Sequence, residues 1–143
     1  MKIKLIKFRD DLIPPTRAHY NDAGIDCFAQ EDFEIGFQRN TLNNDMIMVP
    51  LGFGLEIPNG YMAVIKPRSS MNAKGIITQI GTIDSGYRGE IKAIFINTNS
   101  TFNYHFRKGD KICQIVIEPV ILADVVEDLG EERGEGGFGS TGR

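Results

Sequence analysis

The sequence predicts an all-β fold, a distorted jelly-roll β-sandwich or barrel with one short helix. Short apolar and β-branched runs are separated by turns rich in glycine, proline and asparagine, which is the pattern of sandwiches and barrels. Only residues 69–75 carry helix signals. A chain of 143 residues, 41% of them hydrophobic, suits a single domain with its own core. We expect a jelly-roll domain over residues 1–126 and a flexible glycine-rich C-terminal tail over residues 127–143.

Several stretches have the composition of strands, beginning with an alternation of charged and apolar residues at the N-terminus. Pro14-Pro15 excludes regular structure after the first stretch, and Pro58-Asn59-Gly60 signals a turn. Pro119 lies inside the last stretch, which indicates an edge position or a bulge. The predicted strands cover residues 2–8, 25–29, 32–36, 46–49, 51–58, 61–67, 76–80, 90–97 and 111–122.

The predicted helix follows the strand that Pro67 ends. The Ser69 hydroxyl is its expected N-cap, and Gly75 is its expected stop. Free N–H groups at a helix start attract anions, so Arg68, Ser69 and Ser70 are candidate phosphate contacts. The alternative is that Ser69 only caps the helix while Arg68 makes a surface ion pair.

Charge and cysteine usage narrow the class of protein. The net charge of −3 gives no reason to expect direct binding to nucleic acid or to anionic membranes. No apolar run has the roughly 20 residues that cross a bilayer, and no signal peptide is apparent, so we expect a cytoplasmic protein. Cys27 and Cys113 lie in apolar surroundings and are expected to be buried free thiols. Neither His19 nor His105 has the spacing of a zinc site or catalytic triad.

The turn at residues 84–89 gathers three chemically useful groups. Asp84 could orient or deprotonate a water molecule, and the Tyr87 ring could cover a sugar or a base. Arg88 could pair with a phosphate or a carboxylate. Taken alone, a solvated turn explains the same residues.

Two polar residues interrupt apolar strands. Asp26 needs a partner there, either a hydrated metal ion or an arginine. Gln114 could donate its amide to a ligand, or it could be satisfied within a core or an interface.

The glycine-rich tail carries residues that suit a lid. Its backbone amides, Ser140 and Thr141 could wrap phosphates, Arg133 could neutralise them, and Phe138 could stack on a base. The alternative is an inert terminus, which is the usual fate of such segments.

Five motifs occur in order along nearly the whole chain, and together they resemble the homotrimeric dUTPase family, the deoxyuridine 5'-triphosphate nucleotidohydrolases. Each motif alone is weak, whereas the ordered set is specific. The motifs are DAGIDCFA at 22–29, PRSS with the following helix at 67–75, GTIDSGYRGE at 81–90, RKGDKICQIVI at 107–117 and RGEGGFGSTG at 133–142.

The resemblance implies a jelly-roll subunit in a homotrimer whose three active sites lie at subunit contacts. It implies hydrolysis of dUTP to dUMP and pyrophosphate with Mg²⁺, which supplies dUMP for thymidylate synthesis and keeps uracil out of DNA. By this resemblance Asp84 activates the attacking water, and an aspartate is ionised at neutral pH without any special environment. Positioning and charge neutralisation would supply most of the catalysis.

The same resemblance implies the substrate contacts. The Tyr87 ring would pack on the deoxyribose and exclude a 2′-hydroxyl. Backbone groups between residues 76 and 87 would read uracil, and Asp26 would touch the metal through water. The expected substrate-binding residues are Arg68, Ser69, Ser70, Thr78, Gln79, Thr82, Ile83, Tyr87, Lys92, Gln114, Arg133, Phe138, Gly139, Ser140 and Thr141.

The chain departs from the family pattern in two places. The segment between PRSS and GTID is a few residues shorter, which leaves the contacts of Thr78 and Gln79 open. Cys113 stands where alanine is common. Two alternatives remain: a fold relative, dCTP deaminase, and a dUTPase-like regulatory protein with a further protein partner. The deaminase uses a glutamate where this chain has Ile94, so the proton carrier for deamination is missing.

Overall fold

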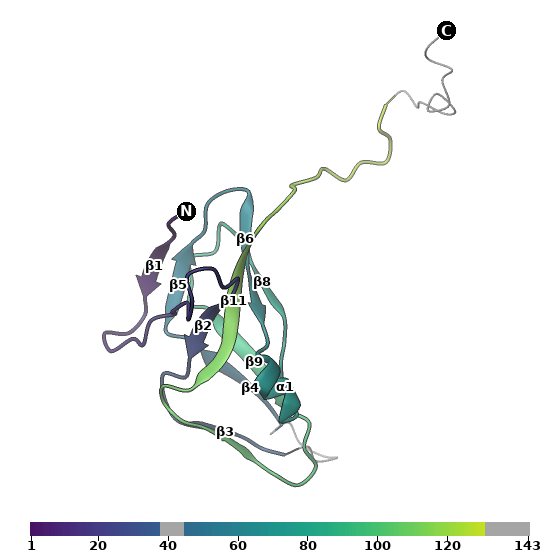
Figure 1. The fold of residues 1–143 in the computed structure, drawn as a ribbon. Helices are drawn as coiled ribbons and strands as arrows, with labels where there is room; N and C mark the ends of the chain where they lie inside the picture. Colours follow the sequence, from purple (N-terminus) through teal and green to yellow (C-terminus); the bar gives the residue numbers. More distant parts are fainter. Residues whose placement is uncertain (38–44, 131–143) are drawn as a thin grey trace.

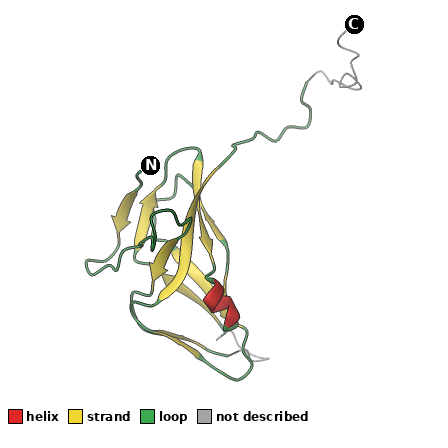
Figure 2. Cartoon of the chain, in the orientation of Figure 1, coloured by secondary structure: helices red, strands yellow, loops and turns green. Residues whose placement is uncertain are grey.

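The computed structural model describes residues 1–37 and 45–130, and apart from one short helix their regular secondary structure is all β-strand (Figures 1 and 2). The prediction of an all-β chain with one short helix is confirmed. The single helix in these ranges is neither long nor apolar enough to cross a membrane. The strands are β1 (Lys4–Lys7), β2 (Ile25–Phe28), β3 (Phe33–Ile35), β4 (Met46–Pro50), β5 (Phe53–Glu56), β6 (Tyr61–Lys66), β7 (Ile76–Thr78), β8 (Gly81–Ile83), β9 (Lys92–Asn97), β10 (Tyr104–Phe106) and β11 (Lys111–Pro119), and the helix is α1 (Ser69–Ala73).

The strands form two main sheets and two smaller ribbons, all antiparallel. One main sheet has the order β2-β11-β6-β8, and the other has the order β4-β9-β7. The ribbons are β1-β5 and β10-β3, and the β3 ribbon extends from the lower end of the molecule in Figure 1. Chain order and spatial order differ, so each sheet brings together motifs that are distant in the sequence.

The core lies between the two main sheets and is fed by alternate residues of their strands. In β9, Ala93, Phe95 and Asn97 are buried while the residues between them are not, as a half-buried strand requires. Phe106 anchors an aromatic cluster, with its ring centroid 4.4 Å from that of Phe33 and 5.5 Å from that of Phe95. This packing fixes the strands from which the polar turns project.

The two cysteines face each other across β2 and β11. Cys27 and Cys113 are register partners, both are fully buried, and both are free thiols, as predicted. The hydrogen bond with Cys113, followed by burial, raises the pKa of the Cys27 thiol well above its ordinary value. Cys27 is therefore a neutral element of the core.

Three local predictions need correction. The Ser69 hydroxyl does not cap α1, because the extended residue Arg68 takes the N-cap position and no side chain makes a capping hydrogen bond. The last strand ends at Pro119 instead of residue 122, where it pairs with Tyr61, the first residue of β6. Strands β8 and β10 were absent from the predicted set. The expected stop at Gly75 is confirmed, with a φ of 78° just after the helix.

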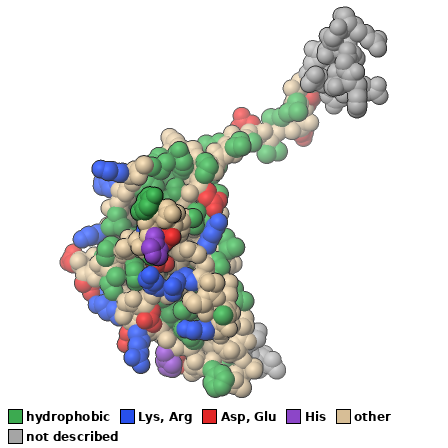
Figure 3. All heavy atoms as spheres, viewed as in Figure 1, with side chains coloured by type: hydrophobic (Ala, Val, Ile, Leu, Met, Phe, Trp, Pro, Cys, Tyr) green, Lys and Arg blue, Asp and Glu red, His purple; other side chains and the backbone are tan. Residues whose placement is uncertain are grey.

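A long arm leaves the body after β11. The Val120 N–H donates to the Gly60 carbonyl at 2.8 Å, and the described residues beyond it extend away from the sheets (Figure 1). Ile121 is 93% exposed and Val125 is 98% exposed. Hydrophobic side chains therefore line an arm that touches little of its own body (Figure 3). The boundary at residue 126 stays a prediction.

Candidate active site

The turn between β8 and β9 holds the groups that the sequence singled out. The Tyr87 N–H donates to the Asp84 carbonyl at 3.1 Å, which closes the turn. The Tyr87 hydroxyl donates to the Glu90 carbonyl at 2.8 Å, so the ring is held at its tip as well as at its base. The Arg88 guanidinium donates to the Ser85 carbonyl at 2.5 Å and folds back on its own turn.

A hollow of about 270 Å³ opens beside this turn. Tyr87, which borders the hollow, is 45% exposed. The Asp84 carboxylate is exposed and has no hydrogen-bonding or ionic partner among the described residues, so it is free to hold a water molecule. The hollow is lined by Ile65, Gly81, Thr82, Ile83, Asp84, Tyr87, Glu90, Ile91 and Lys92.

Strand β8 forms an edge of its sheet along this hollow. It pairs with β6, and no other described strand lies on its free side. An edge strand leaves N–H and C=O groups unpaired. The backbone of Thr82 and Ile83 therefore offers hydrogen-bonding groups that could read a planar base.

Thr78 and Gln79 do not line the hollow. Thr78 is only 2% exposed and lies opposite Phe95, and its hydroxyl has no partner among the described residues. The Gln79 N–H donates to the Ile94 carbonyl at 2.8 Å, which turns the chain from one main sheet to the other. Sequence reasoning left the contacts of these two residues open, and the hollow provides none for them.

A second polar cluster lies where β2, β11 and the end of β6 meet. The Lys111 Nζ lies 2.9 Å from one Asp26 oxygen, and the Arg68 Nε lies 3.8 Å from the other. The Arg68 Nη1 also donates to the Lys111 carbonyl at 3.1 Å. The Asp26 side chain is 16% exposed, so its charge is largely withdrawn from water and is balanced by two cations. Asp26 therefore has the arginine neighbour that its position required, and a lysine as well.

The remaining predicted contacts of this cluster sit beside it. Ser69 and Ser70 are exposed at the start of α1. The Gln114 Nε2 donates to the Pro67 carbonyl at 3.0 Å, and a side chain on Gly24 would collide with the Gln114 amide oxygen at 1.9 Å. Gln114 is therefore held in place by its neighbours, with one of its two amide hydrogens already used.

The two clusters lie at opposite ends of β6. Ile83 pairs with Ala63, so Asp84 lies level with the beginning of that strand. Arg68 follows its end. At about 3.3 Å per residue, the two sites are separated by roughly 15–20 Å along the sheet. One chain therefore does not bring Asp84 and Arg68 to a single phosphate group.

A metal ion would find few ligands of the protein's own. Within the described ranges, no group of three or more His, Cys, Asp or Glu side chains could hold one. Asp26 alone fits a Mg²⁺ that keeps most of its water and is otherwise held by substrate phosphates, which is how Mg²⁺ usually binds nucleotides. The predicted tail contacts, Arg133, Phe138, Gly139, Ser140 and Thr141, lie outside the described residues.

Comparison with known proteins settles the family. A family model for dUTPase matches residues 10–142. The chain belongs to the dUTPase family. It is 42% identical over 149 residues to the deoxyuridine 5'-triphosphate nucleotidohydrolase of Clostridium tetani, covering 100% of this chain and 97% of that one. It is also 42% identical over 148 residues to the enzyme of the same name from Gloeothece citriformis, with 99% and 97% covered.

Solved dUTPase structures share the jelly-roll fold. The dUTPase of Staphylococcus bacteriophage 80alpha superposes with a TM-score of 0.80 at 21% identity, covering 92% of this chain and 98% of that chain. A variant of the dUTPase from phage phi11 of S. aureus, in which a structural Mg(II) ion is coordinated, gives a TM-score of 0.79 at 22% identity, with 90% and 99% covered. The predicted jelly-roll fold and family are both confirmed.

Sequence reasoning missed three residues that shape the site. Lys111 pairs with Asp26, Glu90 accepts the Tyr87 hydroxyl through its carbonyl, and Gly24 makes room for Gln114. The motifs DAGID, YRGE and GDK contain all three. Their neighbours across the strands become visible only once the register is known.

Proposed function

We propose that this protein hydrolyses dUTP to dUMP and pyrophosphate, with Asp84 holding and activating the attacking water. Hydrolysis of dUTP is the function of the family to which the chain belongs. The observation that carries the proposal is the unpaired Asp84 carboxylate at a hollow that the Tyr87 ring borders. A free carboxylate at the edge of such a hollow suits a base that acts on water.

The hollow suits a deoxynucleoside. The Tyr87 ring is fixed at its hydroxyl and would form a rigid wall against the sugar, where an added 2′-hydroxyl has no room. The free backbone edge of β8 at Thr82 and Ile83 would read the uracil edge, and Lys92 would add a positive charge at the rim. Phe138 of the tail would cover the base.

The second cluster suits the phosphate chain. Arg68, Ser69, Ser70 and Gln114 would contact the phosphates. Mg²⁺ would neutralise the charge that develops on the phosphates during attack, and Asp26 would hold the ion through water. The tail would complete the enclosure, with Arg133, Gly139, Ser140 and Thr141 around the phosphates.

The separation of the hollow from the phosphate cluster implies that each site is shared between copies of the chain. We propose the homotrimer of the family. Asp84 and Arg68 lie at opposite ends of β6, too far apart to reach one phosphate group from one chain. A neighbouring copy would supply the missing half. The exposed arm after Val120 gives each chain a segment whose apolar side chains need another surface (Figure 3).

One sheet face suits that contact. Met46, Met48 and Ile77 are 54%, 57% and 44% exposed on the outer side of the β4-β9-β7 sheet. The register places Ile94 and Ile96 beside them on the same face. Five apolar side chains on one sheet face form a patch of the kind that association covers. Strand β9 begins with Lys92, which lines the hollow. A copy of the chain that covers this patch would therefore reach the site.

The test of activity is pyrophosphate release with Mg²⁺ from dUTP, dCTP, dTTP and UTP. We expect release from dUTP alone, lost in Asp84→Asn and retained in Asp10→Asn, a matched change at another exposed aspartate. Ammonia from dCTP would favour the deaminase, and normal turnover by Asp84→Asn would overturn the assignment of the base.

The shared site has its own test, because two inactive variants should complement each other. Asp84→Asn and Arg68→Ala are expected to be inactive alone. After mixing in denaturant and refolding together, random trimers would contain about a quarter of sites with both residues intact, so about a quarter of the activity should return. No recovery in trimers shown to be mixed would mean that each chain builds its whole site.

A further inference from the structure

The Tyr87 wall is tied to a distant part of the chain through Glu90. The Tyr87 hydroxyl donates to the Glu90 carbonyl at 2.8 Å, and the Glu90 carboxylate accepts the Gly52 N–H at 3.0 Å. The next residue, Ile91, is paired with the segment around Gly52 by two backbone bonds of 2.9 Å. Glu90 and Ile91 therefore hold the C-terminal end of the turn that carries Tyr87 against the segment around Gly52.

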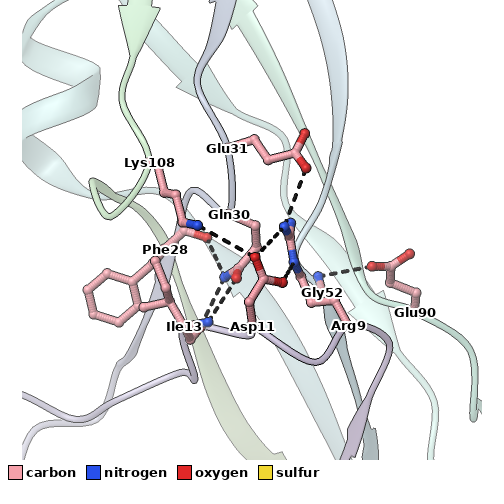
Figure 4. A network of polar contacts seen from close by, with 9 residues as sticks. All are labelled: Arg9, Asp11, Ile13, Phe28, Gln30, Glu31, Gly52, Glu90 and Lys108. Atoms are coloured by element: carbon pink, nitrogen blue, oxygen red, sulfur yellow. Dashed lines mark hydrogen bonds and ion pairs between the residues drawn. The ribbon is translucent and has the colours of Figure 1, made fainter.

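Gly52 has little freedom to move away from Glu90. Its φ of +81° is in the left-handed region, and a Cβ there would lie 2.9 Å from the Leu12 side chain and 3.0 Å from the Arg9 side chain. Arg9 is itself held by Asp11 at 2.7 Å and by Glu31 at 3.3 Å (Figure 4). The turn that presents the Gly52 N–H to Glu90 is thus packed on its other side against Leu12 and against the ion-paired Arg9.

The Tyr87 ring also packs closely against Gly89 of its own loop. A Cβ on Gly89 would lie 2.5 Å from the Tyr87 hydroxyl oxygen. The position of the ring therefore follows the backbone of residues 89–90, and that backbone is fixed by the carboxylate of Glu90. Figure 4 shows the hydrogen bond between the Glu90 carboxylate and the Gly52 N–H.

We infer that Glu90 is a positioning residue that sets the discrimination between deoxyribonucleotides and ribonucleotides. Its carboxylate is bonded to the Gly52 N–H, and through this bond it holds the carbonyl to which the Tyr87 hydroxyl donates. The inference rests on the proposed function, in which Tyr87 borders the deoxyribose. It attributes the fixed position of the Tyr87 ring to the hydrogen bond between the Gly52 N–H, in the β4–β5 turn, and the Glu90 carboxylate.

The substitutions that test it differ only in whether an acceptor remains. Glu90→Gln keeps an oxygen that can accept the Gly52 N–H, whereas Glu90→Met keeps the length of the side chain without an acceptor. The measured quantity is kcat/KM for dUTP divided by kcat/KM for UTP. This ratio is independent of the fraction of enzyme that is folded, because both rates scale with the same active concentration.

We expect the ratio to fall on the order of tenfold in Glu90→Met and to stay near the wild-type value in Glu90→Gln, as for loss of one hydrogen bond. Tyr87→Phe should lower it similarly, and the double variant Tyr87→Phe/Glu90→Met should lower it no further, because both changes cut the same tether. Should Glu90→Met not fold, Glu90→Ala replaces it.

Several results would overturn the inference. An unchanged ratio in both Glu90→Met and Glu90→Ala, even with lower stability, would reduce Glu90 to a structural role. Additive losses in the double variant would separate Glu90 from Tyr87. Absence of dUTP hydrolysis by the unsubstituted protein is a different result, since it would remove the proposed function first and this inference with it.

Discussion

The fit between Gly24 and Gln114 gives a stability prediction that can be worked out from the structure. A Cβ on Gly24 would lie 1.9 Å from the Gln114 Oε1 and 2.9 Å from its Cδ. Neither distance is tolerable, so Gly24→Ala must displace the Gln114 amide by more than about 1 Å. The displacement breaks the hydrogen bond that the Gln114 Nε2 donates to the Pro67 carbonyl at 3.0 Å.

The magnitude follows from three contributions. Loss of the hydrogen bond costs about 1 kcal/mol, and an off-rotamer Gln114 costs about 1 kcal/mol more. Replacing glycine by alanine at a φ that other residues can adopt returns about 0.5 kcal/mol. We expect Gly24→Ala to lower the free energy of unfolding by about 1.5 kcal/mol. In a Gln114→Ala background the obstacle is gone, so the same change should be neutral or stabilising by about 0.5 kcal/mol.

The assay is urea unfolding followed by circular dichroism for the four proteins of this double-mutant cycle. Protein concentration must be equal throughout, because association shifts the apparent stability. The expected coupling between Gly24 and Gln114 is about 2 kcal/mol. A Gly24→Ala effect that is the same in both backgrounds, within about 0.5 kcal/mol, would refute the packing described here.

Three further predictions concern other parts of the molecule. Both cysteines should resist alkylation by iodoacetamide in the native protein and react only on unfolding, because the pKa of Cys27 is raised and both thiols are buried; rapid native labelling would contradict this. The hydrogen bond from Arg9 lowers the pKa of Asp11 to about 2, so this group adds stability above its ordinary value near 3.8 that is lost as the pH falls toward 2. Asp11→Asn should therefore have a lower urea midpoint than wild type at pH 6, with the gap narrowing between pH 4 and pH 2, whereas a constant gap would show that no linked proton is involved. Met48→Asp should dissociate the assembly in light scattering and abolish pyrophosphate release, while the matched change Phe102→Asp at an exposed loop residue should do neither; an intact, active Met48→Asp assembly would place the contact elsewhere.

The sequence predicts those strands whose own composition is sufficient. Residues 61–66 and 92–97 carry enough apolar and β-branched side chains to be recognised without their partners. The three-residue strands β8 and β10 are too short to show a period, and they exist because β6 and β3 pair with them. The hydroxyl cap at Ser69 failed for a related reason, since the extended conformation of Arg68 starts the helix one residue earlier.

The candidate site shows the same division. Motif order identifies Asp84 and Tyr87, and the structure places both at one hollow. The sequence does not predict the partners of the charged groups. Arg88 bonds to its own turn, and Asp26 on β2 pairs with Lys111 on the neighbouring strand β11. These pairings depend on strand register and on loop geometry, neither of which a single sequence specifies.

The length of β6 has a consequence for how activity depends on assembly. In the proposed trimer the strand separates Asp84 from Arg68, so each chain would carry two halves of different sites and would complete neither alone. A nucleotide that bridges such halves would bind the assembled protein and not the free chain, so by mass action it would stabilise the assembly by an amount that grows with the logarithm of its concentration. Samples diluted and incubated without nucleotide before the assay should therefore lose specific activity as the protein concentration is lowered. Samples diluted to the same concentrations with nucleotide already present should keep it. A site built within one chain predicts a specific activity that is independent of dilution.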